Sequence, residues 1–210
     1  MYIVIEGIDC SGKDTVTAAL IKKLEELGHE VVSVREPSDH SEHCREIRKT
    51  LEFTKGLTDI HRYRLLMDAR EHLMRERVSP VMRSEKMIVG NRSFISTLAY
   101  QQSLNSDEVF AENKKLLHHY ETIPDLVVYL DINHETYLAR IRQRREEKST
   151  LEKWIDKKEN FESVRDRYLD VMYDKSLFRS LGGSKSIALM VLDGEKSIES
   201  SVCSILSHLK

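Results

Sequence analysis

The chain has 210 residues, of which 40% are apolar and 32% charged, and its formal net charge is −2. This length suits one compact domain with a full core, and the balanced charge argues against a general nucleic-acid binder. Three scattered cysteines without a C-x-x-C pair argue against a disulfide scaffold, and no apolar run approaches the roughly 18 residues of a membrane span. With no signal segment before the first predicted strand, we expect a cytoplasmic protein that does not bind membranes or nucleic acids.

Apolar runs of strand length alternate with segments of helical periodicity along the whole chain. Strands are predicted at 2–5, 30–34, 86–90, 125–131 and 187–192. Helices are predicted at 13–27, 41–53, 58–83, 134–145, 156–178 and 198–209, with two more before Asp125. This order predicts a single α/β domain over 1–210, with a parallel sheet of about five strands, helices on both faces, and ligands beyond the carboxyl ends of the strands.

The segment 7–15 joins the first predicted strand to the first predicted helix and carries the pattern G-x-x-x-x-G-K. Its residues are Gly7, Ile8, Asp9, Cys10, Ser11, Gly12, Lys13, Asp14 and Thr15. The glycines let backbone N–H groups turn onto an anion, the helix N-terminus adds positive dipole, and Lys13 supplies a point charge for β- and γ-phosphates. The segment is therefore predicted to bind a triphosphate. Asp14 stands where a magnesium-binding Ser or Thr is usual, although a carboxylate can also hold the ion.

Polar clusters follow several of the predicted strands. Arg35-Glu36-Pro37 follows the second strand, Asn91-Arg92-Ser93 the third, and Asp131 ends the fourth. Phosphoryl transfer needs cations around the transferred group, and Arg92 and Arg70 are candidates. For each arginine alone, a surface ion pair is an equally good interpretation.

The stretch 144–150 is polar and lacks an apolar period. A solvated helix end and a mobile lid are both compatible with it.

Five ordered segments together resemble thymidylate kinases. They are 5–9, 35–37, 91–101, 124–131 and the helix 161–168. The resemblance implies a P-loop NTPase-type fold and an enzyme that moves the γ-phosphoryl group of ATP to dTMP, giving dTDP for dTTP synthesis, with Mg²⁺. It also implies a homodimer, for which the helical segments 58–83 and 94–120 would form the interface.

The resemblance also implies roles for single residues. Lys13 would bridge the donor and acceptor phosphates, Asp9 would lie near the acceptor's sugar hydroxyl and the metal, and Arg92 would bind the acceptor phosphate. Asp14 would be the second magnesium ligand. The remaining positions would surround the acceptor nucleotide, and they are Glu36, Pro37, Leu66, Arg70, Ser96, Thr97, Tyr100 and Gln101.

The lid predicted at about 142–156 has a specific task under this resemblance. Some thymidylate kinases place a catalytic arginine inside the phosphate loop, whereas this chain has Cys10 there, so the lid would supply the positive charge. The candidates are Arg142, Arg144, Arg145, Lys148 and Lys153. We favour Arg144 and Lys153.

Three departures from the family pattern define the alternatives. Asp14 replaces a hydroxyl residue, Asn91 replaces the acidic member of an Asp-Arg pair, and Leu66 replaces a Phe that would stack on the base. Leu66 favours a deoxynucleoside monophosphate kinase with broad base choice. The two changes near the metal favour, more weakly, a non-catalytic nucleotide-binding module.

A second motif is the local group His40, His43 and Cys44. It lacks a fourth metal ligand, and the polar residues around it are typical of the start of a helix, so the sequence does not favour a metal site there.

Overall fold

The computed structural model describes residues 1–144 and 150–209. Its sheet has five parallel strands in the order β2-β3-β1-β4-β5. The strands are β1 (Tyr2–Glu6), β2 (Val31–Arg35), β3 (Met87–Asn91), β4 (Leu126–Asp131) and β5 (Ala188–Asp193). The predicted five-stranded parallel sheet is therefore confirmed. All residues of β4 except Asp131 are buried, as its continuously apolar sequence predicts.

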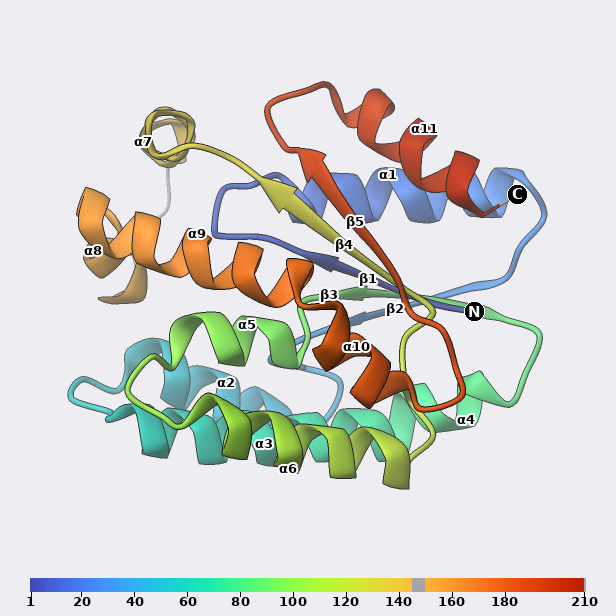
Figure 1. Cartoon of the computed structure of the whole chain (residues 1–210), viewed down its shortest axis with the longest axis horizontal. Coiled ribbons are helices and arrows are strands. Elements are labelled where there is room, and N and C mark those ends of the chain that lie inside the picture. Colours follow the sequence, from blue (N-terminus) through green and yellow to red (C-terminus); the bar gives the residue numbers. More distant parts are fainter. Residues whose placement is uncertain (145–149, 210) are drawn as a thin grey trace.

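Helices connect the strands and cover both faces of the sheet (Figure 1). They are α1 (Lys13–Glu26), α2 (Glu42–Phe53), α3 (Asp59–Leu73), the π-helical turn η1 (Met74–Val78), α4 (Ser79–Met82), α5 (Phe94–Tyr100), α6 (Ser106–His119), α7 (His134–Gln143), α8 (Thr150–Ile155), α9 (Lys158–Tyr173), α10 (Lys175–Gly182) and α11 (Ile198–His208).

Two predicted helical segments are each divided in the structure. The segment 58–83 contains the π turn between α3 and α4, and 156–178 is interrupted at Asp174. The Asp174 carboxylate accepts hydrogen bonds from the backbone N–H groups of Ser176 and Leu177 at 2.9 and 3.0 Å, which caps a new helix, α10.

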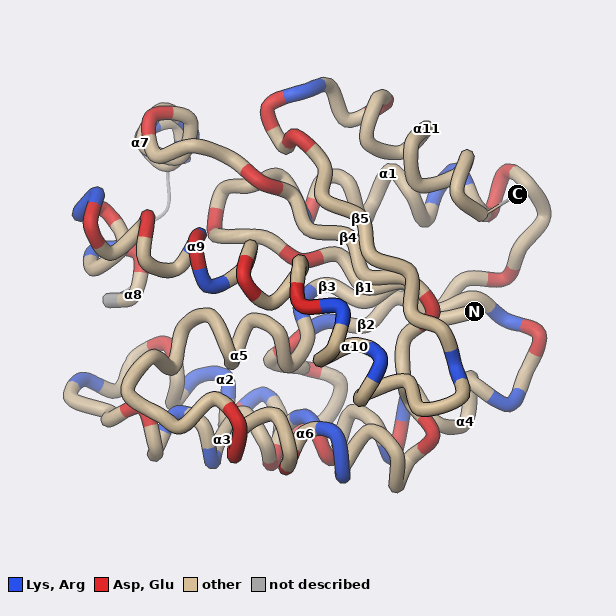
Figure 2. Tube along the Cα trace, in the orientation of Figure 1, with Lys and Arg blue, Asp and Glu red and all other residues tan. Residues whose placement is uncertain are grey.

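Alternation along the strands separates two apolar layers. Ile3 and Ile5 of β1 pack with Leu20 of α1 and Ile205 of α11. The apolar cluster on the opposite face has more members; it includes Val4 of β1 and residues of helices such as α3, α5, α6 and α9. Figure 2 shows the charged positions mostly on the surrounding helices and loops, with the middle of the sheet nearly free of them.

The ends of three neighbouring strands bring their following loops together. Ile5 in β1 is level with Asn91 in β3, and Asn91 is level with Arg35 in β2. The phosphate-loop segment and the polar clusters after β2 and β3 therefore share one edge, as the sequence predicts. Within the described residues, no helix combines the length and apolarity that crossing a membrane requires.

Candidate active site

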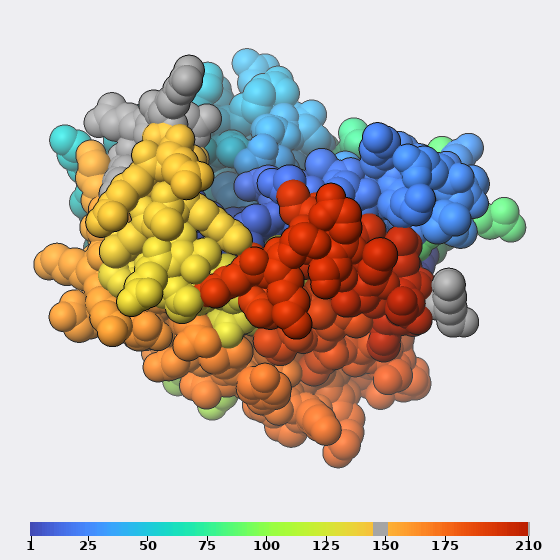
Figure 3. All heavy atoms as spheres, turned by 90° about the horizontal axis from the view of Figure 1, so that it is seen from above, coloured from blue at the N-terminus to red at the C-terminus, as the bar shows by residue number. Residues whose placement is uncertain are grey.

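The loop between β1 and α1 lines a cleft of about 1190 Å³ at this edge of the sheet. Seen from above, the N-terminal segment is recessed between α7, in yellow, and the C-terminal part, in red (Figure 3). A Cβ at Gly7 would lie 2.3 Å from Ser11 Oγ, so the tight turn requires glycine there. No side chain of the described residues caps α1. The N–H groups of its first turn are thus available to an anion in the cleft.

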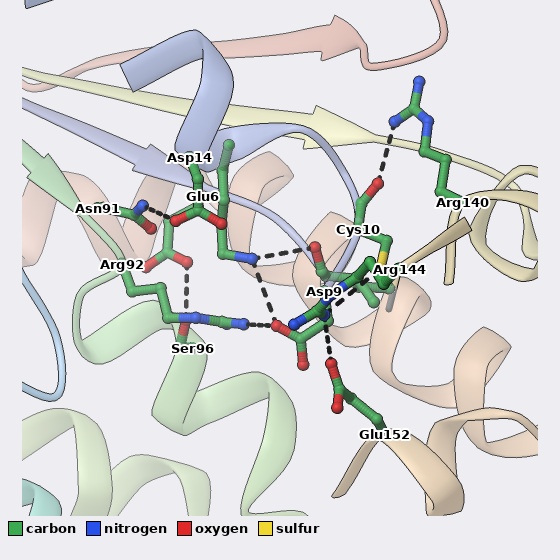
Figure 4. A network of polar contacts seen from close by, with 12 residues as sticks. Glu6, Asp9, Cys10, Asp14, Asn91, Arg92, Ser96, Arg140, Arg144 and Glu152 are labelled. Atoms are coloured by element: carbon green, nitrogen blue, oxygen red, sulfur yellow. Dashed lines mark hydrogen bonds and ion pairs between the residues drawn. The ribbon is translucent and has the colours of Figure 1, made fainter. Parts of the chain in front are cut away.

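Two cations meet one carboxylate above this loop (Figure 4). Lys13 is only 4% exposed, and its Nζ lies 3.3 Å from the Ile8 carbonyl oxygen and 3.4 Å from Asp9 Oδ1. The Arg92 guanidinium pairs with the same Asp9 oxygen. Burial opposes the ionisation of Asp9, but Arg92 and Lys13 together hold its pKa at about 2. Asp9 therefore stays ionised at neutral pH and keeps the two cations side by side.

Arg92 is held in an unusual backbone conformation. Its φ of 70° lies in the left-handed region that non-glycine residues seldom adopt, and its backbone N–H donates to the Ile5 carbonyl at 2.9 Å. The guanidinium also donates to Ser96 Oγ at 3.2 Å and lies 5.6 Å from the centre of the Tyr100 ring. Such strained conformations concentrate at functional sites, which supports a role for Arg92 in binding.

Asp14 and Asn91, two departures from the family pattern, contact each other directly. Asn91 Nδ2 donates to Asp14 Oδ1 at 2.6 Å (Figure 4). Both residues line the cleft, and Asp14 is exposed to it at the start of α1. The amide thus orients a carboxylate beside the phosphate loop, so the site keeps one negative charge at this position.

One wall of the cleft is organised by Arg70, a residue of α3 with only 2% exposure. Its guanidinium donates to Glu36 Oε2 at 2.8 Å, Asn113 Oδ1 at 2.6 Å and Thr97 Oγ1 at 3.0 Å. Arg70 thus joins three segments that are far apart in the chain. Its hydrogen bonds hold Glu36 and Thr97, which were predicted to surround the acceptor nucleotide, in place.

Glu36 Oε1 and Gln101 Oε1 are among the buried oxygens that have no hydrogen-bond partner in the described part of the chain. Both residues line the cleft. Because buried polar atoms are almost always paired in proteins, these acceptors indicate that a ligand with hydrogen-bond donors completes the site.

The hydroxyl groups of Ser96 and Thr97, two of the residues predicted to surround the acceptor nucleotide, already have partners in the protein. Ser96 Oγ donates to Glu6 Oε2 at 2.8 Å and lies 2.8 Å from the Tyr168 hydroxyl, while Thr97 Oγ1 accepts from Arg70. Both residues also line the cleft. Their contact with the acceptor nucleotide remains a prediction.

The predicted lid brings a cation to Cys10. Arg144 Nη1 lies 3.9 Å from Cys10 Sγ and donates to Glu152 Oε1 at 2.5 Å, so it reaches the phosphate loop while paired to α8. Lys153 also lines the cleft, whereas Arg142 is exposed on α7 and is not among the lining residues. The candidates Arg145 and Lys148 lie outside the described residues.

Three further residues of the site were not predicted as site residues. Glu6 is fully buried and accepts from Ser93 Oγ at 2.7 Å and Ser96 Oγ at 2.8 Å; burial raises its pKa, although these hydrogen bonds and Arg92 oppose the shift. Arg140 donates to the Cys10 carbonyl at 3.0 Å, and Glu152 holds Arg144. A charged residue that ends an apolar strand is a usable signal for Glu6. Arg140 and Glu152 look like ordinary polar helix positions in the sequence.

Nearly all the predicted site residues line one cleft. Besides Arg142, the described exceptions are Gly7 and Ile8, which shape the loop behind the cleft. Asp131 was also expected at the ligand edge, but it forms a bidentate ion pair with Arg165. Arg165 Nε donates to Asp131 Oδ1 and Nη2 donates to Oδ2, each at 2.7 Å. Asp131 therefore joins β4 to α9 and is not among the residues that line the cleft.

Known proteins resemble this chain over most of its length. The thymidylate kinase family model matches residues 5–191. Thymidylate kinase from Leptospira borgpetersenii serovar Hardjo-bovis is 35% identical over 157 residues, covering 72% of this chain and 73% of its own. That of Fervidobacterium nodosum is 30% identical over 190 residues, covering 89% and 92%.

The same fold occurs in a solved structure, that of thymidylate kinase from Ehrlichia chaffeensis. It superposes with a TM-score of 0.73 over 98% of both chains at 21% identity. On the evidence of the family model and these relatives, the chain belongs to the thymidylate kinase family.

Proposed function

We propose that this protein transfers the γ-phosphoryl group of ATP to the 5′-phosphate of dTMP, giving dTDP. The observation that carries the proposal is the meeting of Lys13 and Arg92 on Asp9, between the phosphate loop and the wall built on Arg70. One cleft thus offers an anion site for a donor and a second, hydrogen-bonding wall for an acceptor, with cations between them.

Transfer between two phosphates depends on positioning and on positive charge around the moving group. The N–H groups at the start of α1 and Lys13 would hold the donor phosphates, and Arg92 would hold the acceptor phosphate. Arg144 and Lys153 would add charge from the lid side, because Cys10 has none. Asp9 keeps Lys13 and Arg92 oriented, and it would face the acceptor's sugar hydroxyl once a phosphate engages the two cations.

A magnesium ion fits the oxygen donors of the site. Asp14 is an exposed carboxylate oriented by Asn91, and Thr15 next to it also lines the cleft. Asp9 is the less suited of the two predicted ligands, since one of its oxygens already pairs with both Lys13 and Arg92. When bound, Mg²⁺ would neutralise charge on the phosphate oxygens that it contacts.

Leu66 supports broader base choice as a second candidate function. It lines the cleft, where a leucine gives apolar contact without stacking. A broad deoxynucleoside monophosphate kinase would share the phosphate-handling residues and differ only at the base. The non-catalytic alternative is not favoured, because Asp14 and Asn91 together keep a carboxylate beside the loop.

A coupled assay with ATP, Mg²⁺ and a panel of deoxy- and ribonucleoside monophosphates tests these possibilities. Turnover of dTMP well above the others supports the first proposal, and comparable turnover of several bases supports the second. A matched pair of variants, Lys13→Met in the site and Lys22→Met on the exposed side of α1, checks that the activity belongs to this cleft. ATP binding by the unmodified protein without turnover of any nucleoside monophosphate would reject both candidates and favour the non-catalytic alternative.

We also propose that the chain acts as a single domain with a lid over about 142–156, as a cytoplasmic homodimer. The family membership supports the dimer. Light scattering after size-exclusion chromatography tests it, and a monomer at assay concentrations would contradict it.

A further inference from the structure

Helices α2 and α3 lie side by side on one side of the molecule (Figure 1). Cys44, Ile47 and Ala69 form a small buried cluster between them, and Cys44 Sγ donates to the Ala69 carbonyl oxygen at 3.9 Å. The contact fixes the backbone on both sides of the pair. Residues next to this cluster in the sequence, His43 on α2 and Asp68 on α3, therefore have a defined spacing on the outer surface.

Three potential metal ligands converge at that surface. His43 Nε2 lies 3.0 Å from Asp68 Oδ1, and His72 Nε2 lies 3.7 Å from the same oxygen. The three ligand atoms all lie within 4.8 Å of one another, and the two imidazole rings are 4.5 Å apart between centroids. Asp68 and His72 are one helical turn apart on α3, so both project to the same side.

We propose that His43, Asp68 and His72 bind a divalent transition-metal ion, of the Zn²⁺, Co²⁺ or Ni²⁺ type, between α2 and α3. Two imidazoles and one carboxylate are a common ligand set for these ions, and a water would complete a tetrahedral site. With metal-ligand bonds of about 2.0 to 2.1 Å, tetrahedral geometry separates the ligand atoms by about 3.4 Å. The separations of 3.0 and 3.7 Å from Asp68 lie on either side of this value, so small side-chain rotations would bring each imidazole to a tetrahedral separation from the carboxylate oxygen.

The surroundings of His72 contain one group that supports binding and one that opposes it. Metal binding through Nε2 requires the proton on Nδ1, and Glu76 Oε1 lies 3.5 Å from that nitrogen, ready to accept the proton's hydrogen bond. Arg75 Nη2 lies 3.1 Å from the same nitrogen and favours the opposite tautomer, besides adding positive charge near the ion. Glu76 is thus a positioning residue, and Arg75 is a competitor.

The tertiary structure changes which residues form the candidate set. Cys44 is fully buried and turned toward Ala69, so the local group His40, His43 and Cys44 does not form a site. His40 instead contacts Ser38 Oγ at 2.8 Å and Glu76 Oε2 at 3.0 Å. The competing interpretation of His43, Asp68 and His72 is a plain hydrogen-bonded surface cluster, since His43 and Asp68 are 44% and 47% exposed.

A cobalt titration of the full chain without an affinity tag separates the two interpretations. Co²⁺ is followed by its visible absorption, and Zn²⁺ is then added in competition, with excess Mg²⁺ present to occupy oxygen-rich sites. We expect one ion per chain. His43→Ala and His72→Ala should each weaken Co²⁺ binding by more than about tenfold, because even loss of an outer-shell partner costs roughly 10- to 100-fold.

Variants of the surrounding residues make the test sharper. Glu76→Gln should weaken Co²⁺ binding about tenfold, while Arg75→Gln should tighten it, since a competitor and a positive charge are removed. His29→Ala is the matched control, because His29 is an exposed histidine in the turn after α1 and should leave binding unchanged. Thermal unfolding without metal checks that every variant folds, and all substituted side chains are at least partly exposed.

Equal Co²⁺ affinity in the unmodified chain, His43→Ala and His72→Ala would overturn the proposal, as would no binding at all. A weakening by Arg75→Gln would contradict the assigned geometry. Kinase turnover does not enter this readout, so the outcome is independent of the proposed function.

Discussion

Moving the carboxylate from position 14 to position 91 tests whether the pair Asp14 and Asn91 supplies the magnesium-binding carboxylate. Asp14→Thr removes the carboxylate, Asn91→Asp adds a second one, and the double variant moves the single carboxylate from the start of α1 to the end of β3. The hydrogen bond of 2.6 Å between the two residues makes them one unit, so their effects should not add.

The magnitudes follow from this contact. In Asn91→Asp two carboxylates replace the hydrogen-bonded pair and would separate to about 4 Å, where like charges repel by about 1 kcal/mol in water and about 4 kcal/mol at a typical protein surface. Because Asp14 is exposed, we expect the lower part of this range, about 1 to 2 kcal/mol. For a chain of this length that lowers Tm by about 3 to 6 °C, and Mg²⁺ should restore it.

The activity assay measures the Mg²⁺ concentration that gives half-maximal turnover of dTMP. Asp14→Thr alone should raise it about tenfold, equivalent to about 1.4 kcal/mol of lost ion binding. The double variant should return to within about threefold of the unmodified protein, because a carboxylate again faces the phosphates. If the double variant is no better than Asp14→Thr alone, or if Mg²⁺ fails to stabilise Asn91→Asp, the pair is not the metal site.

Three further predictions concern other parts of the cleft. Replacing Arg144 and Lys153 together by Ala should lower kcat more than tenfold, since both are proposed to place positive charge near the transferred group. The control Arg142→Ala should leave kcat unchanged. Equal turnover in all variants would show that the lid residues take no part in the mechanism. Leu66→Phe should raise kcat/KM for dTMP about two- to tenfold relative to nucleoside monophosphates with other bases, as expected from about 0.5 to 1.5 kcal/mol of added aromatic contact. Unchanged kcat/KM values across the substrate panel would place Leu66 away from the base. The pKa of Asp9 is lowered from 3.8 to about 2 in the folded protein, so its ionised form stabilises the fold above about pH 4 and this contribution is lost as the pH falls to about 2. Denaturant unfolding across that window should show a smaller loss for Asp9→Asn than for the unmodified chain, and identical slopes would mean that Asp9 does not pair as described.

The local features of this fold could be predicted because they depend on residues close together in the chain. The phosphate loop needs glycine at two positions, an apolar strand before it and a helix after it, and all of these lie within 2–27. The alternating strands and helices likewise predict a parallel sheet, and the structure confirms it. The shared cleft follows from the same argument, since parallel strands place Glu36, Arg92 and the loop at one edge.

The contacts within the cleft had no such local signal. Arg140 and Glu152 are ordinary polar positions until α7 and α8 are placed against the loop, where they contact the Cys10 carbonyl and Arg144. The pairing of Asn91 with Asp14 joins residues 77 apart, and the group His43, Asp68 and His72 forms only because α2 packs on α3. The sequence by itself determined the fold class and the place of the loop 7–15 between the first strand and the first helix, because backbone periodicity and short-range sterics decide these. Only the tertiary structure decided which charges pair, since an ion pair or a metal site depends on distances of a few ångströms between segments that the chain order leaves free.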